Sequence, residues 1–273
     1  MIVELSEVHL TRMVCAQPGD PRIAVASNLV KLRRVSSTPK IALVAGASGM
    51  VGGYLLQALS EAPEYSRVFA LTRRPLGREA PKVANRIVIF ERMAEQLKGM
   101  SAHEAFCCIG TTRGAAGSDE AFREADVDAV LLFAQAARAA GVNRFVVVSS
   151  VGANATSKKL YLRTKGEMEE AVAMVGFASL DILQPSLLLG ARKETRPLEL
   201  VGRALAPLIN PMLTGSRESL RAIPAETVAR GMIGAARRGG RGVYRYTYAA
   251  IRQLAELRPA QSLAAQAVKK GPA

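Results

Sequence analysis

The chain has 273 residues, a formal net charge of +14 and 49% hydrophobic residues, which allows a large core and excludes general disorder. It contains no run of about 18 uncharged apolar residues, so no membrane-spanning helix is expected. Its three cysteines are too few for a disulfide framework.

The first 39 residues differ from the rest of the sequence. They show no clear hydrophobic periodicity, and the segment 17–21 combines proline, glycine and aspartate, which favours turns. We therefore expect residues 1–39 to be a poorly ordered N-terminal extension. The segment is basic after Met13, as organelle transit peptides are, but Glu4 and Glu7 oppose that interpretation, so a cytoplasmic protein is expected.

From Lys40 onward, short apolar runs alternate with longer amphipathic stretches. Such runs are typical of buried parallel strands, and the stretches between them are typical of crossover helices. Strands are expected at 41–45, 67–72, 86–90, 105–109, 144–149 and 179–184, and helices at 50–60, 119–140 and 157–175. This order predicts an α/β protein with a doubly wound parallel sheet over residues 40–190.

The pattern changes after Gly190. Helices are expected at 198–208, 227–237 and 249–257, with one strand at 243–248. We expect residues 191–258 to form a small, mainly helical C-terminal lobe beside the carboxyl edge of the sheet, where ligands bind in such folds. Residues 259–273 would be a tail.

A glycine-rich segment follows the first predicted strand and leads into a helix. It reads Gly46-Ala47-Ser48-Gly49-Met50-Val51-Gly52. In the dinucleotide fingerprint of Rossmann folds, the first glycine allows a tight turn, the second lets the backbone approach a pyrophosphate, and the third lets the helix pack closely. The free N–H groups at the helix start then bind the phosphates. The segment therefore predicts a dinucleotide site.

Two alternatives to a dinucleotide site fit the sequence less well. A hydrolase nucleophile elbow needs the order G-x-S-x-G, and Ser48 is one position away from it. A serine hydrolase also needs a histidine, and the sequence offers only His9 and His103. The few histidines and cysteines do not form a metal-ligating pattern.

Two arginines, Arg73 and Arg74, follow the second predicted strand. A site that prefers NAD carries an aspartate or glutamate there, which binds the 2′-hydroxyl of the ribose. Guanidinium groups instead bind phosphate, by charge and by a planar set of donors. The arginines therefore predict NADP(H) as the cofactor, with a solvated turn as the alternative.

Tyr161 and Lys165 lie four residues apart at the start of a predicted helix, so they share one face. A neighbouring ammonium favours the phenolate form of a tyrosine, which suits Tyr161 to proton transfer in the interconversion of a carbonyl and an alcohol. Ser150 ends the preceding strand and is expected to orient the substrate oxygen, with Ser149 as the alternative.

These motifs together resemble those of the atypical short-chain dehydrogenase/reductases, in the group that includes a human Tat-interacting oxidoreductase and fungal mitochondrial proteins. The resemblance covers roughly residues 40–235. The segments that carry it are 46–52, 106–114, 148–153 and 161–167, extended by 184–186 and 194–197.

The resemblance implies NADP(H) bound by the glycine segment, Arg73 and Arg74, with Gly110 and Thr111 beside the cofactor. It also implies that Arg113 and Arg196 hold an anionic group near the cleft. The sequence departs from the family pattern at Gln184-Pro185, where many relatives have Arg-Pro. This departure removes a charge near the nicotinamide end.

We therefore predict an NADPH-dependent reductase that acts on a small carbonyl or alcohol substrate. The alternative is a non-catalytic NADPH-binding regulatory or assembly protein that acts through a protein partner.

Of the net charge, +10 falls in residues 190–273. We expect Arg192, Lys193 and Arg196 to steer anionic ligands such as NADPH toward the site rather than to bind nucleic acid. A solvated surface and peripheral contact with an acidic membrane are the remaining interpretations.

Overall fold

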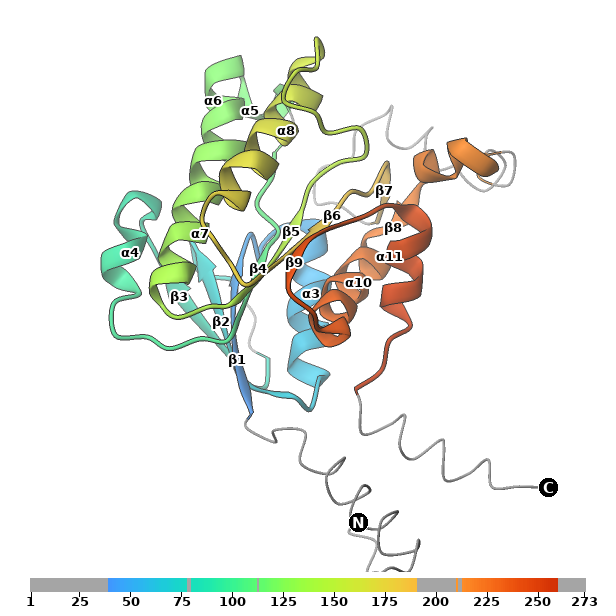
Figure 1. The fold of residues 1–273 in the computed structure, drawn as a ribbon. Helices are drawn as coiled ribbons and strands as arrows, with labels where there is room; N and C mark the ends of the chain where they lie inside the picture. The colour runs from blue at the N-terminus through green and yellow to red at the C-terminus, as the bar shows by residue number, and fades with distance from the viewer. Residues whose placement is uncertain (1–38, 78–79, 112, 191–209, 211–212, 260–273) are drawn as a thin grey trace, which may run out of the picture. The chain divides into compact units, whose positions relative to one another are not determined.

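A seven-stranded parallel sheet forms the centre of the molecule, with the strand order β3-β2-β1-β4-β5-β6-β9 (Figure 1). The structure is a computed structural model, and it describes residues 39–77, 80–111, 113–190, 210 and 213–259. The strands are β1 (Lys40–Ala45), β2 (Tyr65–Thr72), β3 (Val83–Ile87), β4 (Glu104–Cys107), β5 (Arg144–Val148), β6 (Ser179–Leu183) and β9 (Gly242–Tyr246). The first six strands have the order of a doubly wound dinucleotide-binding fold, as predicted.

The central strands are apolar because both faces of the sheet are covered. All residues of β4 and β6 are buried, and so are the last four residues of β1. By contrast, β3 lies at one edge, and its last three residues are exposed. The edge position explains why this strand begins earlier than the predicted 86–90: its sequence lacks the apolar run of a central strand.

Helices cover each face of the sheet and enclose two apolar clusters (Figure 1). One face is covered by α3 (Met50–Glu61), α10 (Ala225–Arg238) and α11 (Tyr248–Ala255). The other is covered by α4 (Met93–Gln96), α7 (Ala129–Ala139) and α8 (Leu160–Ala173).

The single helix expected at 119–140 is divided into three parts. It begins as α6 (Asp119–Arg123), continues as one π-helical turn (Glu124–Asp128) and ends as α7. A π-turn adds a residue to the helical repeat and so changes which side chains face the sheet. Sequence periodicity does not reveal such a change, and the turn brings Asp126 to a fully buried position.

Residue 190 does not mark the end of the sheet. Strand β9 pairs with β6 in parallel, and α10 packs against α3 and β6. Strand β9 and helix α10 fall in the range 191–258, where the sequence predicts a small C-terminal lobe, and instead complete the sheet and its covering layer. Outside those layers stand the two-stranded sheet of β7 (Leu188–Leu189) with β8 (Ile223–Pro224) and the 3-10 helix η4 (Gly215–Leu220).

A buried carboxylate explains why the last strand joins the sheet. Asp181 of β6 is fully buried and forms an ion pair with Arg144 of β5. It also accepts hydrogen bonds from the hydroxyls of Tyr246 in β9, at 2.8 Å, and Ser179, at 3.1 Å. A buried charge is tolerated only when it is paired and hydrogen-bonded. This requirement ties β5, β6 and β9 together, although their residues are distant in the sequence.

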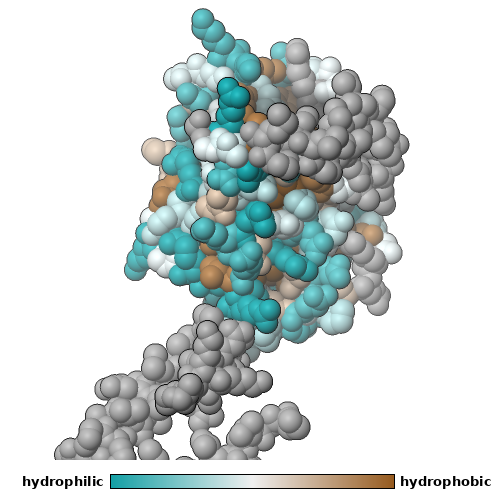
Figure 2. All heavy atoms as spheres, turned by 90° about the vertical axis from the view of Figure 1, so that its right-hand side faces the viewer, coloured by the Kyte–Doolittle hydropathy of each residue, from teal (hydrophilic) through white to brown (hydrophobic). Residues whose placement is uncertain are grey.

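Several expectations lie outside the described residues. They concern the extension at 1–38, the helix at 198–208 and most of the tail. Among the described residues, no helix is long and apolar enough to cross a membrane. The α10–α11 side of the molecule shows mostly hydrophilic side chains on its described surface (Figure 2).

The contact between α10 and α11 predicts the effect of one added methyl group. A Cβ at Gly234 would lie 1.9 Å from the carbonyl oxygen of Leu254, which belongs to the α11 backbone and cannot move away cheaply. Gly234→Ala should therefore lower the free energy of unfolding by about 1–3 kcal/mol, the usual cost of overpacking. Urea denaturation measures this. The control is Arg230→Ala on the same helix, at an exposed side chain, and equal midpoints for both variants would contradict the predicted contact.

Candidate functional site

The parallel register brings the ends of the central strands into one row. Ala45 of β1 lies opposite Leu71 of β2 and Cys107 of β4, and Cys107 lies opposite Val147 of β5. The segments that follow these strands therefore meet at the carboxyl edge of the sheet. This edge is where ligands bind in open α/β sheets.

The first of these segments begins with a glycine that no other residue could replace without strain. Gly46 has a φ of +78°, a conformation that residues with a Cβ rarely adopt. A Cβ at this position would also lie 2.4–2.5 Å from backbone atoms of Cys108 and Ile109, just after β4. The absence of a side chain thus lets the turn after β1 contact the turn after β4 directly.

The third glycine brings α3 against the same turn. A Cβ at Gly52 would lie 2.2 Å from the carbonyl oxygen of Gly46 and 2.8 Å from the Cα of Ala47. Ala47 and Val51 are buried, Met50 is half-buried, and Ser48 and Gly49 are exposed. Ser48 and Gly49, in the middle of the segment, therefore face solvent, and the residues on either side of them pack toward the core.

The start of α3 is suited to an anion. Gly49 occupies the N-cap, and no side chain caps the helix. A Cβ at Gly49 would meet only the carbonyl oxygen of Gly46, at 3.2 Å, so the outer side of this residue is open. Uncapped N–H groups at the positive end of a helix bind phosphates. The loop thus fits the pyrophosphate of a dinucleotide.

Arg73 and Arg74 directly follow β2, beside the end of β1. Both side chains are exposed. Within the described part of the chain, neither guanidinium forms an ion pair or a hydrogen bond with another residue. Their positive charge is therefore available to a ligand at this edge.

Lys165 is buried in a cluster beside the loop after β4. Its ammonium lies 3.4 Å from Asp126 Oδ1, which also accepts a hydrogen bond of 3.0 Å from the Thr111 N–H. A Cβ on Gly110 would lie 3.3 Å from that oxygen and 3.4 Å from the ammonium nitrogen. The lack of a side chain at Gly110 therefore leaves room for the ion pair.

Asp126 was missed by the sequence analysis. Burial raises the pKa of its carboxyl group, and the nearby Lys165 ammonium opposes this shift. Its second oxygen is buried without a hydrogen-bond partner in the described part of the molecule. The local sequence contains three acids, Glu124, Asp126 and Asp128, and only the π-turn selects the middle one for the core.

Tyr161 lies near the start of α8, one turn before Lys165. Its side chain is 41% exposed, and its ring stacks on that of Phe122 with a centroid distance of 5.9 Å. The stacking limits the motion of the ring, while the exposure leaves it accessible to a ligand. No hydrogen bond between described residues joins Tyr161 to Lys165 or to Ser150.

The two serines after β5 have different surroundings. The Ser149 hydroxyl donates a hydrogen bond of 2.6 Å to Glu169 Oε1, which also accepts one from the Gln184 amide at 2.8 Å. The other oxygen of Glu169 pairs with Arg245 at 2.8 Å. Ser150 is also buried, but among the described residues its hydroxyl makes only a weak hydrogen bond, to the Val151 carbonyl oxygen at 3.5 Å.

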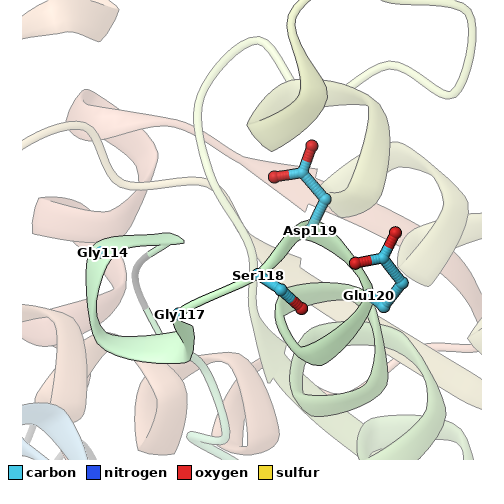
Figure 3. Close-up of a pocket in the computed structure, with 5 residues that line it drawn as sticks. All are labelled: Gly114, Gly117, Ser118, Asp119 and Glu120. Carbon is cyan, nitrogen blue, oxygen red and sulfur yellow. The ribbon is translucent and has the colours of Figure 1, made fainter.

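A surface hollow of about 550 Å³ lies between α5 (Arg113–Ala116) and α6 (Figure 3). Its lining consists of Gly114, Gly117, Ser118, Asp119 and Glu120, none of which was predicted as a site residue. The Ser118 hydroxyl accepts a hydrogen bond from the N–H of Ala121 and so caps α6. The two carboxylates would repel phosphate, so the glycine loop fits a dinucleotide better than this hollow does.

The remaining expected basic side chains fall outside the part of the chain that the structure describes. Arg192, Lys193 and Arg196 lie outside the described residues, and the side chain of Arg113 is not described. Among the described residues, no group of three or more histidine, cysteine, aspartate or glutamate side chains could hold a metal ion.

Comparisons with known proteins agree with this geometry. Residues 46–203 match the NAD(P)H-binding family. The chain is 37% identical to protein HTATIP2 of Rattus norvegicus over 216 residues, which cover 77% of this chain and 87% of that protein. It is 35% identical to protein fmp52, mitochondrial, of Aspergillus clavatus over 202 residues, which cover 71% of this chain and 86% of that protein. Because the fungal relatives are named mitochondrial, the comparison does not confirm the predicted cytoplasmic location.

Solved structures show the same fold at lower identity. MoeE5 in complex with UDP-glucose and NAD has a TM-score of 0.57 and 20% identity, over 76% of this chain and 75% of that one. The UDP-glucose 4-epimerase of Thermotoga maritima, solved with UDP-glucose, has a TM-score of 0.59 and 13% identity, over 80% and 84%. The glycine loop, the strand order and these relatives lead to one conclusion: the chain has a Rossmann fold and belongs to the NAD(P)H-binding family, with HTATIP2 and the fungal FMP52 proteins among its relatives.

Proposed function

We propose that the chain is an NADP(H)-dependent oxidoreductase that interconverts a carbonyl and an alcohol. The observation that carries this proposal is the buried Lys165 ammonium, which Asp126 holds beside Gly110 and the Thr111 N–H. Burying a charged pair costs free energy, and such pairs are common at functional sites. Here the ammonium lies one helical turn from the exposed ring of Tyr161.

The residues proposed to bind the cofactor lie in the segments that follow β1, β2 and β4, at the carboxyl edge of the sheet. Gly46, Gly49 and Gly52, with the first turn of α3, would hold the pyrophosphate, and Gly110 and Thr111 would lie along the cofactor. Arg73 and Arg74 would bind the 2′-phosphate, because their guanidinium groups are exposed and have no described partner. When bound, NADP(H) supplies or accepts the hydride.

Tyr161 would give the proton to the substrate oxygen in reduction and take it back in oxidation. Lys165 would stabilise the phenolate that is left and bind the ribose. Ser150 would orient the substrate oxygen, because the hydroxyl of its neighbour Ser149 is already bound to Glu169. These roles need the glycine loop and the start of α8 on the same edge of the sheet.

The alternative is a non-catalytic NADPH-binding regulatory or assembly protein. It would use the same glycine loop and the same arginines, but not the phenol of Tyr161. The two proposals therefore agree on cofactor binding and differ in whether the chain turns over a substrate.

The exposed arginines predict which cofactor the chain prefers. Titration of the full chain should show tighter binding of NADPH than of NADH. The double variant Arg73→Ala/Arg74→Ala should remove this preference, because a charge-assisted hydrogen bond to phosphate contributes about 1.5–3 kcal/mol. Arg252→Ala is the control, because it also removes the positive charge of an exposed arginine, but on α11 and not after β2. Equal affinities of the unmodified chain for the two cofactors would contradict the NADP assignment.

The next prediction concerns the proton donor. Tyr161→Phe should reduce turnover of a responsive carbonyl substrate by a factor of about 10² or more, because it removes the acid/base group. NADPH binding should remain, as judged by cofactor fluorescence.

A panel of aldehydes and ketones, followed through NADPH oxidation, supplies the substrate for this measurement. Tyr244→Phe is the control, because Tyr244 lies on the edge strand β9, away from the glycine loop after β1, and its hydroxyl donates to the nearby Arg241 carbonyl oxygen. Undiminished activity of Tyr161→Phe would remove Tyr161 from the mechanism. An unmodified chain that binds NADPH and turns over no member of the panel would support the regulatory alternative.

A further inference from the structure

The two arginines that follow β2 lie on a short turn that is fixed at both ends. Thr72, the last residue of β2, is buried, and its carbonyl oxygen accepts a hydrogen bond of 2.9 Å from the Val88 N–H. Pro75 follows Arg74, and a proline restricts both its own φ and the conformation of the residue before it. The side chain of Leu76, which comes next, packs partly buried against the core.

A single side chain, that of Asn85, connects the two ends of this turn. Its amide nitrogen donates to the carbonyl oxygen of Ala70 at 3.0 Å and to the hydroxyl oxygen of Thr72 at 2.7 Å. Its amide oxygen accepts the Leu76 N–H at 3.0 Å. Asn85 lies on the edge strand β3, opposite Ala70. One amide group thus binds the chain on both sides of Arg73 and Arg74.

The chemistry of asparagine suits this position. The three hydrogen bonds require N–H donors that face β2 and an oxygen acceptor that faces Leu76. A side-chain amide carries the NH₂ donor and the oxygen acceptor on the same carbon atom. An aspartate would keep the acceptor but lose the donors, and it would add a negative charge next to the two arginines. An alanine would lose all three hydrogen bonds.

The fixed turn matters because arginine side chains are long and lose conformational entropy when they bind a ligand. If the backbone that carries them also moved, binding of a phosphate would have to order the backbone as well. A turn that is already ordered reduces this cost, which is the general effect of preorganisation on affinity. Only a ligand that contacts the arginines would have to order the turn, so a looser turn should weaken the binding of NADPH more than that of NADH.

We propose that Asn85 is a positioning residue that strengthens the chain's preference for the phosphorylated dinucleotide, by fixing the turn that carries Arg73 and Arg74. This inference rests on the proposed NADP(H) specificity. It assigns to Asn85 no contact with the cofactor.

The test compares the affinities of the full chain for NADPH and NADH, by titration with cofactor fluorescence, in Asn85→Ala. NADPH affinity should fall about 3- to 10-fold, as expected when hydrogen bonds of ordinary strength are lost, and NADH affinity should change less than about twofold. Ile87→Ala provides a matched control, because Ile87 is an exposed residue on the same strand and the same face. This variant should leave the ratio of the two affinities unchanged.

A second set of variants separates positioning from stability. In the Arg73→Ala/Arg74→Ala background, Asn85→Ala should cause no further loss of NADPH affinity, because the arginines through which it acts are gone. Thr72→Val removes one partner of Asn85 and keeps the shape of the side chain, so it should weaken NADPH binding in the same direction by a smaller factor. It replaces the first variant if Asn85→Ala does not fold.

The outcomes distinguish the two proposals. If the double arginine variant keeps the preference for NADPH, the proposed cofactor site is contradicted. If that variant loses the preference but Asn85→Ala and Thr72→Val keep it, only the role of Asn85 is overturned. Equal losses for NADPH and NADH would likewise overturn it, because they would show that Asn85 merely supports the edge of the sheet.

Discussion

At the carboxyl edge of the sheet, three stretches of backbone lie so close together that no Cβ fits between them. The turn at Gly46 contacts the chain just after β4, and the first turn of α3 contacts Gly46 through Gly52. Because the helix is held this close to the strand, its uncapped N–H groups are directed to the edge where the strands end. The proposed site for a dinucleotide phosphate is therefore a consequence of backbone packing rather than of any one side chain.

The loop after β4 also depends on a glycine, in this case to make room for an ion pair. Gly110 has no side chain to separate the loop after β4 from the ion pair of Asp126 and Lys165. The pair connects helix α8 to the π-turn before α7, and the Thr111 N–H joins it to the loop. A charged pair buried in this way is a weak source of stability, but it holds its members in one arrangement. The ammonium of Lys165 is thereby kept at the edge where the cofactor is proposed to bind.

Two polar groups extend this organisation to the outer strands. Asn85 connects β3 to both ends of the turn after β2, and Asp181 connects β6 to β5 and β9. Each joins parts of the chain that the sequence separates, by 9 to 15 residues for Asn85 and by 37 and 65 residues for Asp181. The buried carboxylate of Asp181 needs these partners, because a donor or acceptor removed from water must be satisfied. Asn85 is exposed, and it joins its partners because one amide group both donates and accepts.

The sequence by itself determined the class of fold, the approximate positions of the first six strands along the chain and the position of the glycine loop. These features depend on short-range signals: apolar runs of strand length, and glycines at fixed spacing between a strand and a helix. It also singled out Arg73, Arg74, Tyr161 and Lys165, whose spacing is local, but the roles of these residues remain predictions. Only the tertiary structure decided that Asp126 is buried beside Lys165, that the Ser149 hydroxyl is bound to Glu169, and that β9 completes the sheet. Each of these depends on a contact between residues far apart in the chain, which neither periodicity nor spacing can reveal.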